Sequence, residues 1–220
     1  MPLATKGREI PIKKAQTRAV AVTTSAAAAK PALEKKSGRL SAAPVDMTLP
    51  VPEQKQLADN WCWAACCAML VKFFYDKEVR QCRMANQLFG QTVCCSSLTP
   101  STETACDQGC QLDDVAKIYS KFGVQVTLQK RPVSFATVQA EIEAGRPVLV
   151  GFMFEGGGSH VVMIRGCFEV GGERFLKVND PKDGSVSLRS LTDVRTANQR
   201  GAWKFSWIGI QKTDHNGGGK

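Results

Sequence analysis

A cysteine at the start of an apolar run is the residue with the clearest potential for chemistry in this sequence. Cys62 opens the stretch CWAACCAML, and apolar residues continue at helical spacing as far as Phe74. Asp59 or Asn60 stands where a helix N-cap is expected. Because the positive end of a helix dipole favours a thiolate in the first turn, we predict a nucleophilic thiol at this position.

A glutamine six residues before this cysteine adds a second functional group. An amide N–H of Gln56 is suited to bind an oxyanion that forms beside Cys62. Gln54 lies eight residues upstream and does not have this spacing. The alternative is that Cys62, between Trp61 and Trp63, is a small buried apolar residue.

The sequence contains two histidines, and only one of them is placed to act as a base. His215 lies in the polar C-terminal segment, whereas His160 follows the glycine run 156–158 at the start of an expected strand. An imidazole beside a thiol stabilises the thiolate and later protonates the leaving amine. The glycines allow close approach of a substrate backbone or movement of the loop as a lid. A purely structural or exposed histidine is the alternative.

An acidic residue is expected beside His160. A hairpin with Gly171-Gly172 at its turn brings the start of one strand close to the end of the next, at 179–180. A carboxylate or amide there orients an imidazole and fixes its tautomer. We favour Asp180, with Asn179 as the competing residue, although Asn-Asp-Pro is also ordinary turn chemistry.

The elements that position these residues are predicted as helices first and antiparallel strands afterwards. Helices are expected at 62–74, 80–89, 111–122, 135–144 and 191–198, and strands at 124–128, 148–154, 160–170, 173–178 and 202–210. This order is typical of an α+β fold. The helix of the nucleophile is expected to pack on a small antiparallel sheet.

Composition divides the chain into three parts. Residues 1–50 contain nine Lys or Arg, three Asp or Glu and no aromatic residue, which predicts a disordered basic tail. The folded domain is expected at 51–211, followed by a flexible Gly-rich tail at 212–220. No basic patch is interleaved with aromatics, so a nucleic-acid partner is not expected. No stretch reaches the roughly 18 apolar residues of a membrane span.

The nine cysteines leave three interpretations open. The first interpretation is a set of disulfides around the loop 91–111, and the second is unpaired buried thiols. The third is a zinc site, for which the spacing of the cysteines is poor. If Cys62 is a thiol, eight cysteines remain for up to four bridges. Disulfides indicate that the protein functions in an oxidising compartment. The run 19–29 also faintly resembles a signal peptide. We therefore expect a secreted or exported protein, with a cytoplasmic location still open.

The combination of these motifs resembles the papain-like cysteine proteases. Gln56 precedes Cys62-Trp-Ala by six positions, and Gly-Ser-His160-Val-Val and Asn-Asp180-Pro follow. The resemblance covers about 51–211 and is closest to a compact bacterial branch of secreted effector proteases of plant pathogens and peptidases that trim double-glycine leaders. It implies a papain-like fold and a Cys-His-Asp triad, with Gln56 in the oxyanion hole.

The same resemblance implies a substrate site and a set of partners. Its substrate-binding residues would be Trp63, Gly157, Gly158 and Ser159. It implies a polypeptide substrate, a monomer, and neither cofactor nor metal. The gap between Cys62 and His160 is shorter than the roughly 130–150 residues of papain and cathepsins, which predicts a reduced sheet domain.

Three functions follow as hypotheses. The first is a cysteine peptidase that hydrolyses peptide bonds, with self-cleavage in the basic tail as an added hypothesis. The second is an acyltransferase of the transglutaminase or arylamine acetyltransferase kind, in which an amine rather than water resolves the thioester. The third is a catalytically silent binding module held together by disulfides.

Overall fold

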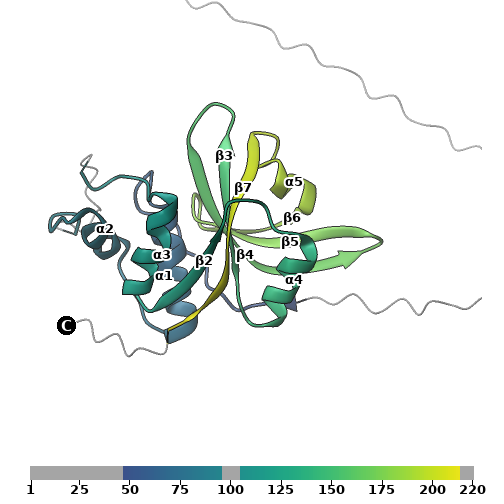
Figure 1. Ribbon diagram of the computed structural model, residues 1–220, viewed down its shortest axis with the longest axis horizontal. Helices are drawn as coiled ribbons and strands as arrows, with labels where there is room; N and C mark the ends of the chain where they lie inside the picture. Colours follow the sequence, from purple (N-terminus) through teal and green to yellow (C-terminus); the bar gives the residue numbers. More distant parts are fainter. Residues whose placement is uncertain (1–46, 96–104, 214–220) are drawn as a thin grey trace, which may run out of the picture. The chain divides into compact units, whose positions relative to one another are not determined.

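Three helices precede most of the sheet in the chain. The computed structural model describes residues 47–95 and 105–213, all of them within one unit, Ala42–Lys220. Its first helices are α1 (Cys62–Tyr75), α2 (Gln81–Phe89) and α3 (Leu112–Lys121). They lie together on one side of the sheet, and α1 packs against strand β4 (Figure 1).

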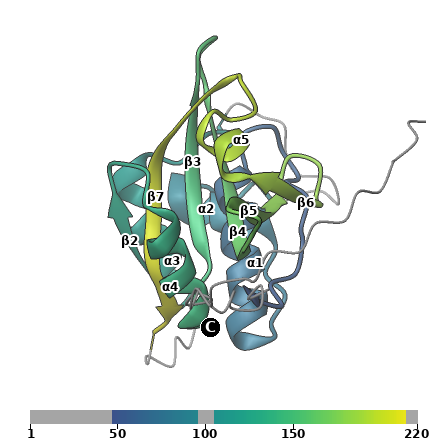
Figure 2. The same ribbon diagram turned by 90° about the vertical axis from the view of Figure 1, so that its right-hand side faces the viewer.

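The strands of the described residues form one antiparallel sheet. They are β1 (Met47–Thr48), β2 (Val124–Gln129), β3 (Val148–Phe154), β4 (Ser159–Val170), β5 (Glu173–Asp180), β6 (Ser185–Ser190) and β7 (Gly201–Lys212). Their order is β2-β7-β3-β4-β5-β6, and β1 pairs with β4. Figure 2 shows β2 and β7 side by side at one edge, as the register of the two strands requires. The expected α+β fold with an antiparallel sheet is confirmed.

Two short helices lie beside the sheet on the side away from α1 (Figure 1). The first, α4 (Phe135–Glu143), begins after Ser134, whose side chain accepts a hydrogen bond from the Thr137 amide at 3.0 Å. The second, α5 (Leu191–Arg195), is capped in the same way by Ser190. The predicted cap at Ser134 is therefore confirmed, because a serine hydroxyl satisfies an amide that the helix itself leaves without a partner.

The sheet separates two apolar cores. One is formed by α1, α2 and α3 with the facing side of the sheet, and α1 buries an unbroken run from Trp63 to Val71 in it. The other is formed by α4, α5 and the opposite side, around Val162, Val178 and Trp203. Helix α1 is therefore fixed by burial along its middle, whereas Cys62 at its start and residues 72–75 at its end are half-buried.

The predicted N-cap of α1 is wrong, and the sheet includes two strands in addition to the expected ones. The N-cap of α1 is Trp61, without a side-chain cap, and neither Asp59 nor Asn60 takes that place. The sheet begins at Met47, which pairs with Cys167, so ordered structure starts before the expected boundary at residue 51. Strand β6 was not predicted. The rest of the basic tail, and His215 with the Gly-rich end, lie outside the described residues.

Disulfides form in the expected region, although only four cysteines take part. Cys82 pairs with Cys95, and Cys94 pairs with Cys106, so the two bridges fasten α2 and the residues after it. The other five cysteines, all described, are thiols: Cys62, Cys66, Cys67, Cys110 and Cys167. Within the described ranges no helix is long and apolar enough to cross a membrane.

Candidate active site

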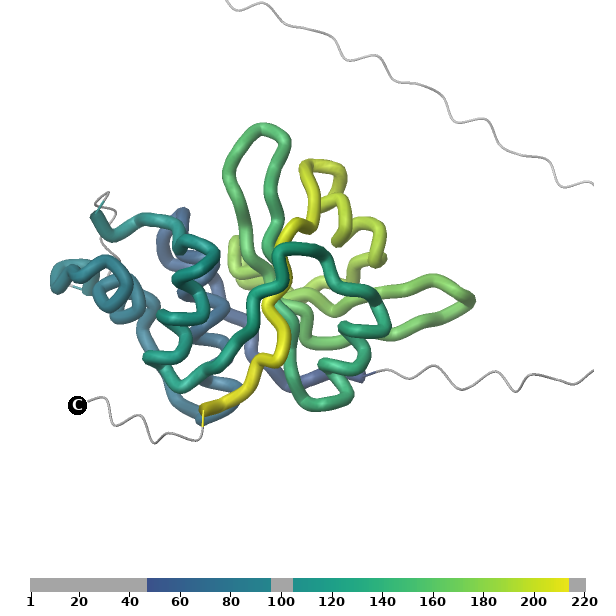
Figure 3. Tube along the Cα trace, in the orientation of Figure 1, coloured from purple at the N-terminus to yellow at the C-terminus, as the bar shows by residue number. Residues whose placement is uncertain are grey.

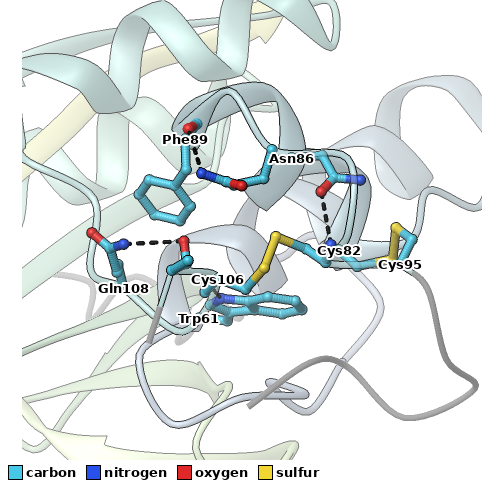
Figure 4. Close-up of a disulfide and its surroundings, with 10 residues drawn as sticks. Trp61, Cys82, Asn86, Phe89, Cys95, Cys106 and Gln108 are labelled. Carbon is cyan, nitrogen blue, oxygen red and sulfur yellow. Dashed lines mark hydrogen bonds between the residues drawn. A yellow bond between two sulfur atoms is a disulfide. The ribbon is translucent and has the colours of Figure 1, made fainter. Parts of the chain in front are cut away.

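The start of α1 is held by side chains of its own first turn. The Trp61 indole is fully buried and donates to the Cys106 carbonyl at 2.8 Å. The Trp63 indole donates to the Gln108 carbonyl at 3.1 Å. Figure 4 shows Trp61 beside Cys106 and its disulfide. The two tryptophans thus fix the backbone on either side of Cys62, whose side chain remains half-buried.

His160 is supplied by the sheet. It is the second residue of β4 and pairs with Phe152 of β3. The β3–β4 hairpin that contains this pair projects from the rest of the sheet (Figure 3). Gly157 and Gly158 form the turn of this hairpin with φ of 89° and 85°, a region that L side chains rarely adopt. The glycines therefore serve the tight turn from which the histidine strand begins.

Asp180 lies directly against His160. His160 Nε2 is 2.7 Å from Asp180 Oδ1, and both side chains are 12% exposed. Asn179 points elsewhere: it is buried, and its amide donates to the carbonyls of Val51 and Pro52 at 3.3 and 3.1 Å. Of the two neighbouring candidates, the structure therefore brings Asp180 to the imidazole and uses Asn179 to fasten the entering chain.

Cys62 lies close enough to the imidazole to raise the pKa of His160. Because Nε2 faces Asp180, Nδ1 is the ring nitrogen that remains available to Cys62. Burial lowers the pKa of His160, but the interactions with Asp180 and Cys62 outweigh burial and raise the pKa to about 9. Asp180 and Cys62 together therefore favour an imidazolium at His160.

An arginine that the sequence analysis did not identify completes this group. Arg189 Nη2 on β6 is 2.9 Å from Asp180 Oδ2, and the Lys182 amide donates to Oδ1 at 3.1 Å. Burial raises the pKa of Asp180, yet the contacts with His160, Arg189 and Lys182 hold it well below its usual range. Recognition of β6 as a strand, from the alternation in SVSLRS, is the signal that would have placed Arg189 near Asp180.

Gln56 lies in the turn that leads to α1. Its backbone N–H donates to the Pro181 carbonyl at 2.7 Å, which places it next to the Asp180 segment. Its side-chain Nε2 donates to the carbonyls of Ala58 and Asp59 at 3.0 and 2.6 Å. Among the described residues, its Oε1 is buried without a hydrogen-bond partner. The amide therefore shapes the turn before Cys62 in this structure.

A second glutamine supports the same turn and was also missed. Gln81 at the start of α2 is 1% exposed. Its Oε1 accepts from the Leu57 amide at 3.0 Å, and its Nε2 donates to the Lys55 carbonyl at 2.8 Å and to Gln54 Oε1 at 3.2 Å. Gln54 is thus a partner of Gln81. These contacts hold the backbone on both sides of Gln56.

The expected substrate-binding residues fall into two groups. Gly157, Gly158 and Ser159 are exposed on the β3–β4 hairpin before His160. Trp63, however, is only 2% exposed and stacks edge-on against Phe89 in the helical core. Its indole is therefore a packing and anchoring group in this structure, and we propose no substrate contact for it.

The other thiols of the helical part are unsuited to nucleophilic attack. Cys66 and Cys67 lie one turn below Cys62 on α1 and are fully buried. Burial raises the pKa of both thiols, and burial with nearby Asp114 raises that of Cys110 to about 12. Among the described residues, no group of three or more His, Cys, Asp or Glu side chains is placed to hold a metal ion.

Comparison with known proteins gives the family. A search of curated proteins found no match for this chain. A family model described as papain-like cysteine protease AvrRpt2 matches residues 45–199, which includes every residue from Cys62 to Arg189. The matched segment is well over half of the sequence. The chain therefore belongs to the papain-like cysteine protease AvrRpt2 family, and the protein is a cysteine peptidase of that bacterial effector type.

Proposed function

We propose that this peptidase cleaves peptide bonds with Cys62 as nucleophile, His160 as acid and base, and Asp180 as the group that orients the imidazole. The observation that carries the proposal is the 2.7 Å distance between His160 Nε2 and Asp180 Oδ1, at an imidazole whose pKa nearby Cys62 also raises. A carboxylate in this place fixes the tautomer and stabilises the imidazolium.

The reaction proceeds in two halves. The Cys62 thiolate attacks the peptide carbonyl carbon, and the carbonyl oxygen becomes an oxyanion. The imidazolium of His160 gives its proton to the leaving amine, the C–N bond breaks, and a thioester to Sγ remains. Neutral His160 then takes a proton from water, whose oxygen attacks the thioester. The C–S bond breaks, the carboxylic acid leaves, and the site again holds a Cys62 thiolate beside a protonated His160.

Two donors are available for the oxyanion. As the first residue of α1, Cys62 has an N–H that no helical carbonyl accepts, and the helix dipole adds positive potential there. Gln56 is the second donor, provided that one N–H of its amide turns from Ala58 or Asp59 toward the substrate. The loss of one such donor typically costs about 10²–10³-fold in turnover.

Hydrolysis of a quenched fluorescent peptide library tests the proposal. Wild type should cleave a subset of peptides, whereas Cys62→Ser and His160→Gln should lose activity. Gln56→Ala should lower turnover, and Gln139→Ala serves as the matched control, because the half-buried side chain of Gln139 on α4 bonds to Glu143 of the same helix. Addition of an amine nucleophile separates hydrolysis from acyl transfer: if the amide product dominates over the acid, the hydrolase mechanism is contradicted for this chain.

We also propose that the protein acts as an exported monomer. The two disulfides support an oxidising destination, because such bridges are rare in reducing compartments. Light scattering after gel filtration measures the oligomeric state, and fractionation of the producing cells measures the location. A dimer, or a protein confined to the cytoplasm with reduced cysteines, would contradict these two proposals.

A further inference from the structure

We propose that Arg189 is a positioning residue that fixes the Asp180 carboxylate against His160 and moderates its negative charge. The inference rests on the proposed function of Cys62, His160 and Asp180. It assigns a role in that function to a residue of strand β6, which does not itself contact the imidazole.

The two oxygens of Asp180 have different partners. Oδ1 faces His160 Nε2 at 2.7 Å and accepts from the Lys182 amide at 3.1 Å. Oδ2 accepts from Arg189 Nη2 at 2.9 Å. With both oxygens engaged, the carboxylate cannot rotate about its χ2 torsion without loss of a charge-assisted hydrogen bond. Arg189 therefore sets which oxygen is presented to the imidazole.

The guanidinium is itself held in place. Arg189 Nε donates to Ser187 Oγ at 2.8 Å on the same strand. In the β5–β6 register, Asp180, Val178 and Leu176 pair with Ser185, Ser187 and Arg189. Alternate residues of a strand share a face, so Ser187 and Arg189 lie on the face of the sheet toward which Asp180 projects.

The ion pair differs from an ordinary surface pair. The Arg189 and Asp180 side chains are only 17% and 12% exposed. Exposed pairs contribute little because water screens them, whereas a pair shielded from water retains most of its field. The positive charge of Arg189 therefore stabilises the Asp180 carboxylate. It also partly offsets the stabilisation that this carboxylate gives to the imidazolium of His160.

The charged and titratable groups around His160 come from four segments. α1 supplies Cys62 and, below it, the buried Cys66; β5 supplies Asp180; β6 supplies Arg189. The β5–β6 turn supplies Asp183, whose carboxylate is turned to the Ser185 amide at 2.9 Å. Within the described residues, the ion pairs of Asp180 are those with His160 and Arg189.

Loss of Arg189 has two separable consequences. The carboxylate gains rotational freedom, which lowers the rate at the pH optimum. Its negative charge is also no longer balanced, which stabilises the imidazolium of His160 and moves the loss of its proton to higher pH. A residue that merely supports the fold would lower the rate equally at every pH.

The test is the pH dependence of Cys62 modification by a peptidyl epoxide, followed by intact mass. Opening of the epoxide produces an alkoxide that takes the proton of the imidazolium, so the rate falls as His160 loses its proton. For Arg189→Gln we expect the rate of modification at the pH optimum to be about 5-fold lower. The basic limb of the pH–rate profile, where the rate falls at high pH, should move to higher pH by about half to one unit. Arg189→Lys, which keeps the charge, should restore the wild-type limb.

Two further variants keep the test decisive. Ser187→Ala frees the guanidinium but keeps its charge, so the rate should fall without a shift of the limb. Arg174→Gln removes an exposed pair with Glu169 on the β4–β5 hairpin, with side chains 52% and 46% exposed, and should match wild type. A basic limb that is identical in wild type, Arg189→Gln and Arg189→Lys would overturn the inference.

The same experiment separates this inference from the proposed function. If Cys62 reacts no faster in wild type than in His160→Gln at any pH, the proposed catalytic roles of Cys62 and His160 are contradicted. If wild type depends on His160 but Arg189→Gln retains the wild-type profile, only the role of Arg189 fails.

Discussion

His160 Nε2 lies 2.7 Å from Asp180 Oδ1, although the two residues are 20 positions apart in the chain. The β4–β5 hairpin brings them together, because it folds the end of β5 back beside the start of β4. Because Nε2 is engaged by Asp180, Nδ1 is the ring nitrogen that remains available to Cys62 on helix α1. This single contact therefore decides how the imidazole is presented to the thiol.

The substitution Asp180→Asn should weaken catalysis without abolishing it. An amide oxygen still accepts from Nε2–H, but the charge that stabilises the imidazolium is lost. The difference between a charged and a neutral hydrogen bond is about 1.4 kcal/mol, so we expect a decrease of about tenfold in kcat/KM. The basic limb of the pH–rate profile should move to lower pH. An unchanged limb would contradict the account of His160.

The neighbouring substitution Asn179→Ala should act on stability instead. The Asn179 amide is buried and donates to two carbonyls of the entering chain, at Val51 and Pro52. Loss of these hydrogen bonds should lower the free energy of unfolding by about 1–3 kcal/mol, as measured by urea denaturation. The pH dependence of Cys62 modification should stay that of wild type, and a shifted pH profile would argue against the division of roles between residues 179 and 180.

Stability should depend on pH through His160. The pKa of His160 is raised from 6.5 to about 9 in the folded protein, so its protonation stabilises the fold fully below about pH 6.5 and no longer does so above about pH 9. Urea midpoints of wild type and His160→Gln, measured from pH 6 to 9.5, should therefore converge as pH rises. A constant difference across this range would show that the imidazolium is not stabilised.

The two disulfides should contribute alike to stability and differently to the active site. Their partners are separated by 13 and 12 residues, so removal of either pair by Cys→Ser substitution should cost about 3 kcal/mol. Only the Cys94–Cys106 bridge adjoins Trp61, which precedes Cys62. Its loss should slow epoxide modification of Cys62, with the Cys82–Cys95 variant as matched control. Equal rates for the two variants would contradict this coupling.

Most elements of the fold were predictable because their signals are local. The apolar spacing after Cys62 predicted α1, Gly90 ends α2 in a left-handed conformation, and Ser134 caps α4 as expected. The run 148–154 coincides with β3. Each of these patterns depends on residues that are neighbours in sequence, so no knowledge of the tertiary structure was needed.

The missed features depend on distant partners. Strand β6 is polar and short, and it becomes a strand because β5 offers a free edge. Arg189 acquires its place only when β6 returns beside Asp180. Trp63 follows Cys62 in sequence, but its indole is buried and donates to the Gln108 carbonyl. The N-cap at Trp61 likewise follows from the contact with Cys106, which sequence spacing does not reveal.

Modification of Cys62 by a papain-selective epoxide, read by intact mass, tests the central claim most directly. Wild type, Cys62→Ala and His160→Ala are each incubated with the reagent under conditions that keep the fold. We predict one adduct on wild type and none on either variant, since the reaction needs both the thiolate and the imidazolium proton. A folded wild type without an adduct, or an adduct that persists in His160→Ala at the same rate, would contradict a His160-activated nucleophile.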